Sequence, residues 1–242
     1  MSTRHLTLHH NVFAGRVGRG VRVAIVDSGV SLDHPHVGDV TERVRVDASA
    51  VIHNDDVLDR LGHGTAVAAA IREKAPACEL LSVKVFDRSL ATSVESLAEG
   101  ITWAANHGSR LINLSLGTPN PHREELLRWA VGHAARHGAL VVSAAESEGV
   151  RWLPGSLAGV AGVLVDWDCA RNAFDIEFEA GTPTRFRASA YPRPIPGVPR
   201  ERNVSGISFA VANVTGFLAR LLEIDPDVGS LEALGRLVAR EA

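Results

Sequence analysis

The chain has 242 residues, of which 45% are hydrophobic and 22% are charged, with a formal net charge of -3. This length and composition suit a single α/β domain with a large buried core, and they exclude a fibrous or disordered chain. The weak negative charge provides no general attraction to nucleic acid or to anionic membranes, so neither is expected as a partner. We divide the chain into an N-terminal extension, residues 1–20, and one domain over residues 21–242.

Membrane and secretory segments are not expected. The longest uncharged apolar runs, residues 138–145 and 160–165, are too short to cross a bilayer. Residues 1–20 hold Arg4 and three histidines without a continuous apolar segment, which does not match a signal peptide. Cys78 and Cys169 stand far apart and outside any metal-ligand spacing, which favours reduced thiols. The expected location is therefore the cytoplasm.

The first predicted strand is a β-branched run over residues 21–26 that ends at Asp27-Ser28-Gly29. The pattern is typical of a buried parallel strand, and open α/β sheets carry their chemistry at the carboxyl ends of such strands. Asp27 is therefore a candidate functional residue. Taken locally, the same Asp also fits the cap of a turn.

A histidine between two glycines comes next, in Gly62-His63-Gly64-Thr65, before an Ala-rich segment over residues 66–73. This segment predicts a closely packed helix, and the flanking glycines leave the imidazole of His63 unobstructed at its start. A capping or metal-binding role is the weaker interpretation, because no second ligand-type residue stands four positions later.

The middle of the chain alternates between strands and helices. Strands are predicted within residues 40–50 and over 80–86, 111–116 and 139–145, and helices over 93–107 and 123–137, each followed by a glycine. This alternation predicts a doubly wound, mostly parallel sheet with helices on both faces.

The last third has a different pattern. Phe174, Ile176 and Phe178 alternate with acidic residues before a turn sequence at residues 181–183. The alternation predicts a small antiparallel hairpin on the edge of the sheet. Two helices, around residues 211–222 and 230–240, are expected to close the chain.

A serine precedes the first of these two helices, in Gly206-Ile207-Ser208-Phe209-Ala210. At the first turn of a helix, unpaired backbone N–H groups and the helix dipole favour developing negative charge, which suits a nucleophile. By itself the pattern also fits a helix N-cap.

The three segments around Asp27, His63 and Ser208, in this order, resemble the three signature blocks of the subtilisin-like serine proteases, peptidase family S8. The resemblance covers residues 21–222 and implies a subtilisin-like catalytic domain. It implies that Ser208 is the nucleophile, His63 the general base and Asp27 the group that orients His63. Residues 112–117 are similar to the substrate-binding strand of the family.

From that strand, the resemblance implies that Ser115, Leu116 and Gly117 pair with the backbone of an extended peptide. A departure lies at Ser147, where the family has the Asn that donates a hydrogen bond to the oxyanion. Ser147 is the candidate donor in its place, through a shorter side chain. Glu146, beside it, adds negative charge, which is unfavourable unless it points away or binds a basic substrate group.

Two loops are shorter than in secreted members of the family. Only a few residues separate the segment 66–73 from the strand at 80–86, where many relatives insert a calcium-binding loop, so no metal and no cofactor are expected. The segment 147–154 is also short. Arg151 and Trp152 line or fill the primary specificity pocket in one interpretation, and Trp152 packs on the surface beside Pro154 in the other.

Two classes of function follow. The first is an intracellular serine endopeptidase that makes a limited cut in a peptide or protein precursor. The alternative is a catalytically impaired protein of the same fold that binds an extended peptide or a partner protein. Asp27, His63 and Ser208 together favour the first, and Ser147 keeps the second open.

Overall fold

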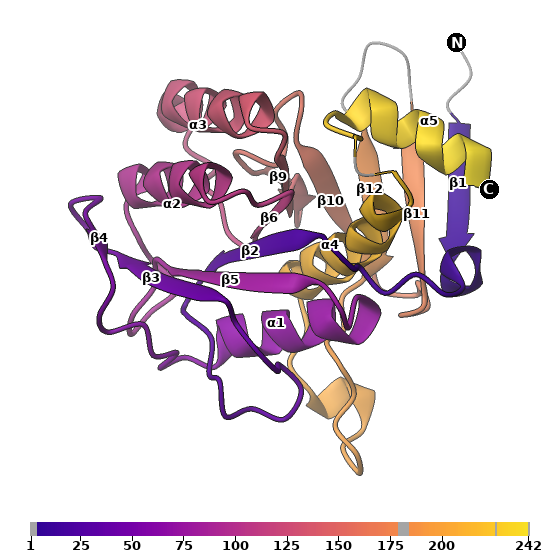
Figure 1. Cartoon of the computed structure of the whole chain (residues 1–242), viewed down its shortest axis with the longest axis horizontal. Coiled ribbons are helices and arrows are strands. Elements are labelled where there is room, and N and C mark those ends of the chain that lie inside the picture. Colours follow the sequence, from indigo (N-terminus) through magenta and orange to yellow (C-terminus); the bar gives the residue numbers. More distant parts are fainter. Residues whose placement is uncertain (1–3, 179–183, 226, 242) are drawn as a thin grey trace.

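The computed structural model describes residues 4–178, 184–225 and 227–241. The fold is a mixed sheet covered by helices on both faces (Figure 1). The strands and helices are β1 (Arg4–His9), η1 (His10–Phe13), β2 (Arg22–Asp27), β3 (Glu42–Val46), β4 (Ile52–His53), α1 (His63–Lys74), β5 (Glu79–Lys84), α2 (Val94–Asn106), β6 (Leu111–Leu114), η2 (Pro121–Arg123), α3 (Glu124–Arg136), β7 (Leu140–Ala144), β8 (Glu146–Ser147), β9 (Val150–Arg151), β10 (Ala161–Asp166), β11 (Ala173–Phe178), β12 (Arg185–Ser189), η3 (Arg200–Arg202), α4 (Ile207–Ile224) and α5 (Leu231–Glu241).

Within the described residues, ten strands form the main sheet in the order β1-β11-β12-β10-β7-β6-β2-β5-β3-β4. The neighbours from β12 to β3 are all parallel. Every residue of β6 and β7 is buried, as expected for central strands covered on both faces. The predicted fold class, a doubly wound and mostly parallel sheet, is therefore confirmed.

The helices divide the core in two. α2 and α3 pack together on one face of the sheet, and α1 and α4 pack together on the other (Figure 1). Among the described helices, α4 alone is long and apolar enough to cross a bilayer, and 72% of it is buried inside the protein. This helix is longer than the uncharged apolar runs at residues 138–145 and 160–165. Its packing against α1 and the central strands is that of a core helix.

The predicted hairpin is present, because β11 pairs antiparallel with β12. Its predicted position on the edge of the sheet is wrong, since β1 pairs antiparallel with β11 on the outer side. The turn at residues 181–183 lies outside the described residues. β1 belongs to the segment that was assigned to an N-terminal extension, and it is part of the same sheet. A six-residue strand with few apolar side chains leaves little periodicity to detect.

The carboxyl ends of the central strands define where a site can form. β2 ends at Asp27, β5 ends at Lys84, and β6 leads directly into Ser115. β2 is hydrogen-bonded in parallel to both β5 and β6, so the carboxyl ends of these three strands lie side by side. We call this side, where the strands end, the carboxyl edge of the sheet. α1 and α4 begin at the same edge, with His63 and Ser208 in their first turns.

Candidate active site

Asp27 is completely buried at the end of β2. Its Oδ1 accepts hydrogen bonds from the backbone N–H of Ser28, at 2.8 Å, and from Nδ1 of His63, at 2.7 Å. Its Oδ2 is buried and has no hydrogen-bond partner among the described residues. A buried carboxylate oxygen bonded to Nδ1 determines which nitrogen of the ring carries the proton, and it leaves Nε2 for another group.

His63 is the first residue of α1, and glycines on both sides make this position possible. Gly62 has φ 74°, a left-handed conformation that glycine adopts without strain. A Cβ on Gly64 would lie 2.2 Å from the backbone oxygen of Gly29. The first turn of α1 therefore packs directly on the loop after Asp27. This close approach brings the His63 side chain to the carboxylate.

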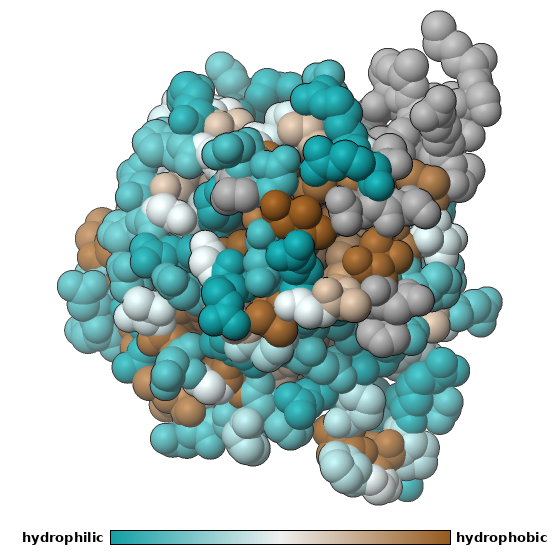
Figure 2. Space-filling view, turned by 45° about the vertical axis from the view of Figure 1, so that its right-hand side comes forward, coloured by the Kyte–Doolittle hydropathy of each residue, from teal (hydrophilic) through white to brown (hydrophobic). Residues whose placement is uncertain are grey.

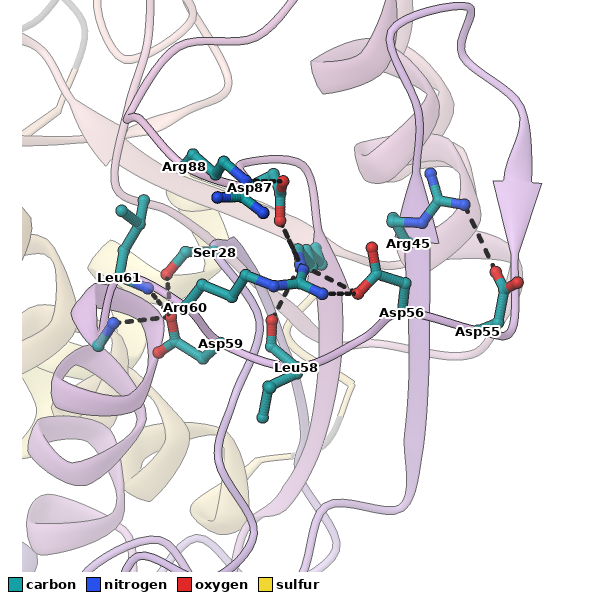
Figure 3. Close-up of polar contacts among 12 residues, drawn as sticks. Ser28, Arg45, Asp55, Asp56, Leu58, Asp59, Arg60, Leu61, Asp87 and Arg88 are labelled. Atoms are coloured by element: carbon teal, nitrogen blue, oxygen red, sulfur yellow. Dashed lines mark hydrogen bonds and ion pairs between the residues drawn. The ribbon is translucent and has the colours of Figure 1, made fainter.

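Asp59, in the loop before α1, was not singled out from the sequence. Its Oδ1 accepts hydrogen bonds from the Ser28 hydroxyl and from the N–H groups of Leu61 and Gly62. Its Oδ2 accepts from the N–H and the hydroxyl of Thr65. One carboxylate therefore joins the end of β2 to the beginning of α1 (Figure 3). An acidic residue a few positions before a helix start is the signal that points to it.

Next to Asp59, a cluster of ion pairs holds the same loop to β5. The guanidinium of Arg60 lies between the carboxylates of Asp56 and Asp87, with N–O distances of 2.5 and 2.6 Å (Figure 3). The ammonium of Lys84, 1% exposed, donates to Asp87 and to the backbone oxygen of Leu58, each at 2.9 Å. The Lys84 hydrogen bond is the largest cause that lowers the pKa of Asp87. The loop that precedes His63 is thus fixed at both ends.

Ser208 lies in the first turn of α4, after Gly206, whose φ of 150° favours glycine. Its hydroxyl donates to the backbone oxygen of Ser115, with an O–O distance of 3.4 Å. Ser208 and His63 line the same pocket, which has a volume of about 540 Å³. A larger pocket of about 750 Å³ lies near the C-terminal end of α1 and includes neither residue. The structure thus brings together the three side chains predicted from distant segments.

Asn113 is a second residue whose role the sequence did not indicate. It is fully buried in β6, where its amide nitrogen donates to the hydroxyl of Ser115 at 3.0 Å. Its amide oxygen accepts from the hydroxyl of Thr215 in α4 at 2.9 Å. A buried polar group is retained in a core only when its hydrogen bonds are satisfied. This chain of bonds links Ser115 to the helix that carries Ser208.

The segment predicted to bind substrate, Ser115 to Gly117, follows β6 at the same edge. Ser115 is 1% exposed, and its backbone oxygen faces Ser208. A Cβ on Gly117 would lie 2.1 Å from the backbone oxygen of Leu153. Thr118 exchanges both of its backbone hydrogen bonds with Leu153, each at 2.9 Å. The chain beyond Gly117 is therefore already paired with another segment.

Ser147 does not line the pocket shared by His63 and Ser208. Ser147 lies in β8, which forms a two-stranded antiparallel hairpin with β9. In the backbone register of this hairpin, Glu146 lies opposite Arg151. Burial lowers the pKa of Arg185, as does the charge of Arg151, while the charge of Glu146 opposes them. Trp152 is half-buried, and its indole nitrogen is buried.

The electrostatic environment of His63 favours its charged form. Burial of the ring opposes protonation, but the hydrogen bond and charge of Asp27, with the charge of Asp59, outweigh it and raise the pKa of His63 above 6.5. An imidazole in this environment accepts a proton readily and stabilises the resulting cation. The arrangement can therefore remove a proton from a hydroxyl and return it to a leaving group.

Comparison with known proteins agrees with this geometry. The family model described as "Subtilase family" matches residues 18–151. M-protease of Shouchella clausii is 32% identical in an alignment 239 residues long, which covers 92% of this chain and 59% of that protein. Subtilisin BL of Lederbergia lenta is 31% identical over 92% of this chain and 84% of that protein. The chain thus spans less than two thirds of the first of these relatives.

Solved structures show the same fold. A mutant of the protease domain of PatA superposes with a TM-score of 0.62 at 28% identity, over 87% of this chain and 82% of that one. Sphericase superposes with a TM-score of 0.69 at 22% identity, over 92% and 82%. The family match, together with an Asp, a His and a Ser that meet at one sheet edge in the order of its signature blocks, establishes that the chain belongs to the subtilase family.

Proposed function

We propose that this chain is a serine endopeptidase in which Ser208 attacks the peptide carbonyl, His63 is the general base and Asp27 orients His63. The observation that carries this proposal is the 2.7 Å bond from Nδ1 of His63 to the buried Asp27, with Ser208 in the same pocket as His63. That bond leaves Nε2 as the nitrogen that takes the Ser208 proton. The relatives named above are proteases, which supports the same reaction.

In the first step, the Ser208 oxygen bonds to the carbonyl carbon while His63 takes the hydroxyl proton. The negative charge on the carbonyl oxygen is stabilised by N–H groups at the start of α4, including that of Ser208 itself. His63 then returns the proton to the leaving amine, and an acyl-enzyme remains. Water, activated by the same imidazole, hydrolyses this ester and restores Ser208.

The substrate is a peptide or protein precursor that the enzyme cuts at a limited number of sites. The segment 147–154, which is shorter than in many members of the family, is held in the β8–β9 hairpin and by the pairing of Leu153 with Thr118. This short, paired segment supports a restricted choice of cleavage sites.

We place the activity in a reducing compartment, the cytoplasm. Cys78 and Cys169 are free thiols, and burial raises the pKa of each to about 11. Neither thiol is therefore activated for oxidation. The activity requires no metal or cofactor in this proposal, because only residues 75–78 connect α1 to β5, where many members of the family insert a calcium-binding loop.

One observation favours a second function, the binding of an extended peptide or partner protein without turnover. Ser147 stands where the family has the Asn that donates to the oxyanion, and the serine side chain is shorter than that of Asn. Under this alternative, Ser208→Ala leaves the function in the cell unaltered.

The deciding experiment is labelling with a fluorophosphonate probe, followed by measurement of the intact mass. Such probes react with a serine that a base and an oxyanion site activate together. We expect one adduct on the wild-type chain, none on Ser208→Ala, and one on the matched control Ser205→Ala, a serine that lines the same pocket. A well-folded wild-type chain that takes up no probe would contradict the peptidase and favour the binding protein.

A further inference from the structure

The pocket of His63 and Ser208 has an apolar wall. Leu61, Leu90 and Val204 line it, and their exposed fractions are 37%, 46% and 58%. The remaining apolar lining includes Ile207 and Phe209, on either side of Ser208. Large apolar side chains this exposed cost solvation free energy unless a ligand covers them. Their gathering beside the reactive hydroxyl indicates that the ligand is part of the substrate.

The position of the pocket tells which part of the substrate enters it. The pocket lies between the start of α1, including Ala66, and residues 204–209 of the other wall. Ser115, whose backbone oxygen accepts the hydrogen bond of the Ser208 hydroxyl, does not line it. Because His63 delivers its proton to the leaving amine, the chain that follows the scissile bond must pass His63. The pocket is therefore on the leaving-group side.

Further exposed apolar side chains lie on the segment that precedes Val204. Val204 directly follows a segment, residues 192–203, that projects from the body of the protein below α1 (Figure 1). Ile195 and Val198 of this segment are 49% and 39% exposed. In the space-filling view, apolar atoms lie on this projection, while most of the surrounding surface is hydrophilic (Figure 2).

We propose that this pocket binds a bulky apolar side chain of the residue that directly follows the scissile bond, and so selects peptides such as those with Leu, Ile, Met or Phe at that position. The inference rests on the proposed peptidase function and specifies its substrate class. Burial of the side chain against Leu61, Leu90 and Val204 supplies the selectivity, because the same pocket offers little to a glycine or a carboxylate.

The test uses the whole chain and a synthetic mixture of unstructured peptides, with the cleavage sites read by mass spectrometry. We expect Leu, Ile, Met and Phe to be preferred over Gly and Asp after the scissile bond by about tenfold or more. Val204→Asn and Val204→Asp should each lower this ratio severalfold, without changing the distribution of residues before the bond. The neutral and charged variants together separate loss of apolar surface from added charge.

The matched controls are Val51→Asn and Val51→Asp, because Val51 is 50% exposed and does not line the pocket. We expect both to cleave with the wild-type profile. If the probe labels Ser208 but the profile after the bond is flat, or is unchanged in the Val204 variants, the pocket assignment is overturned and the peptidase remains. If neither labelling nor cleavage occurs, the proposed function is overturned, and this assignment falls with it.

Discussion

The hydroxyl of Ser28 donates a hydrogen bond to Asp59, with an O–O distance of 2.8 Å. The same hydroxyl accepts from the backbone N–H of Gly64 at 2.9 Å. Ser28 follows Asp27, and Gly64 follows His63, so these two bonds align the carboxylate with the imidazole. Asp59 is thereby a positioning residue. It holds Ser28, which follows Asp27 and binds Gly64, the residue after His63, and Asp59 itself touches no reacting atom.

Asp59→Asn tests this role. The amide replaces an acceptor of the Thr65 hydrogen bonds with a donor, and we expect the free energy of unfolding to fall by about 1–3 kcal/mol. Chemical denaturation measures the loss, and the rate of probe labelling at Ser208 should fall with it. Asp55→Asn is the control, because its side chain is 81% exposed, and a change there should stay within about 0.5 kcal/mol. Equal stability of the two variants would contradict the role.

The pKa of His63 predicts how the activity depends on pH. The base must be neutral to accept the Ser208 proton, and its pKa is raised above 6.5. The labelling rate should therefore rise with pH and reach half of its maximum above pH 6.5. A half-maximum at or below pH 6.5 would show that Asp27 and Asp59 do not outweigh the burial of the ring.

The same shift affects stability with the opposite pH dependence. A histidine whose pKa is raised in the folded chain contributes stability that is fully present below the unfolded value, and this contribution is lost as the pH rises through the folded value. Replacing His63 with Gln should remove this dependence from a series of unfolding curves measured between about pH 5 and 9.

Ser147→Asn tests the oxyanion site. An amide on a longer side chain extends further than the hydroxyl, and we expect the turnover number to increase, by at most the roughly 10²–10³-fold that one oxyanion donor is worth in subtilisin. Steady-state kinetics on a cleaved peptide measure it. Ser147→Ala is the matched variant and should change turnover little. A loss near 10²-fold in that variant would mean that Ser147 already donates to the oxyanion.

Metal removal is expected to have no effect. The described residues contain no cluster of three or more His, Cys, Asp or Glu side chains arranged to hold a metal ion. Thermal unfolding in excess EDTA should match unfolding in excess calcium, and labelling of Ser208 should proceed equally in both. A drop in the melting temperature on chelation would indicate a metal site in this chain.

Gly64→Ala tests the packing that brings α1 to Asp27. Its Cβ would meet the backbone oxygen of Gly29 at 2.2 Å, so α1 must shift, and we expect a loss of about 1–3 kcal/mol or more together with loss of labelling. Gly132→Ala is the matched control, because its Cβ would lie 3.5 Å from the nearest atom, the Nη1 of Arg136. There we expect a gain of about 0.5–1 kcal/mol from helix propensity.

Part of the site is formed by hydrogen bonds between residues far apart in the sequence, which no local sequence pattern predicts. Asp59 and Asn113 were not singled out, because their roles come from partners 31 and 102 residues away in the sequence, Ser28 and Thr215. β1 was missed for the same reason, since its pairing with β11 joins two distant parts of the chain. Contacts of this kind arise from packing, whereas hydrophobic periodicity reports only which face of a single element is buried.

The sequence by itself determined the α/β class, the order of its central strands and helices, and the three segments that carry Asp27, His63 and Ser208. These follow from local physics, because buried parallel strands need continuous apolar runs, and helices are marked by capping residues at the start and by glycine after the end. Only the tertiary structure decided that these segments meet at one sheet edge and that exposed apolar side chains from separate segments line the pocket of His63 and Ser208. Each depends on side chains from several elements that come together only when the core has packed.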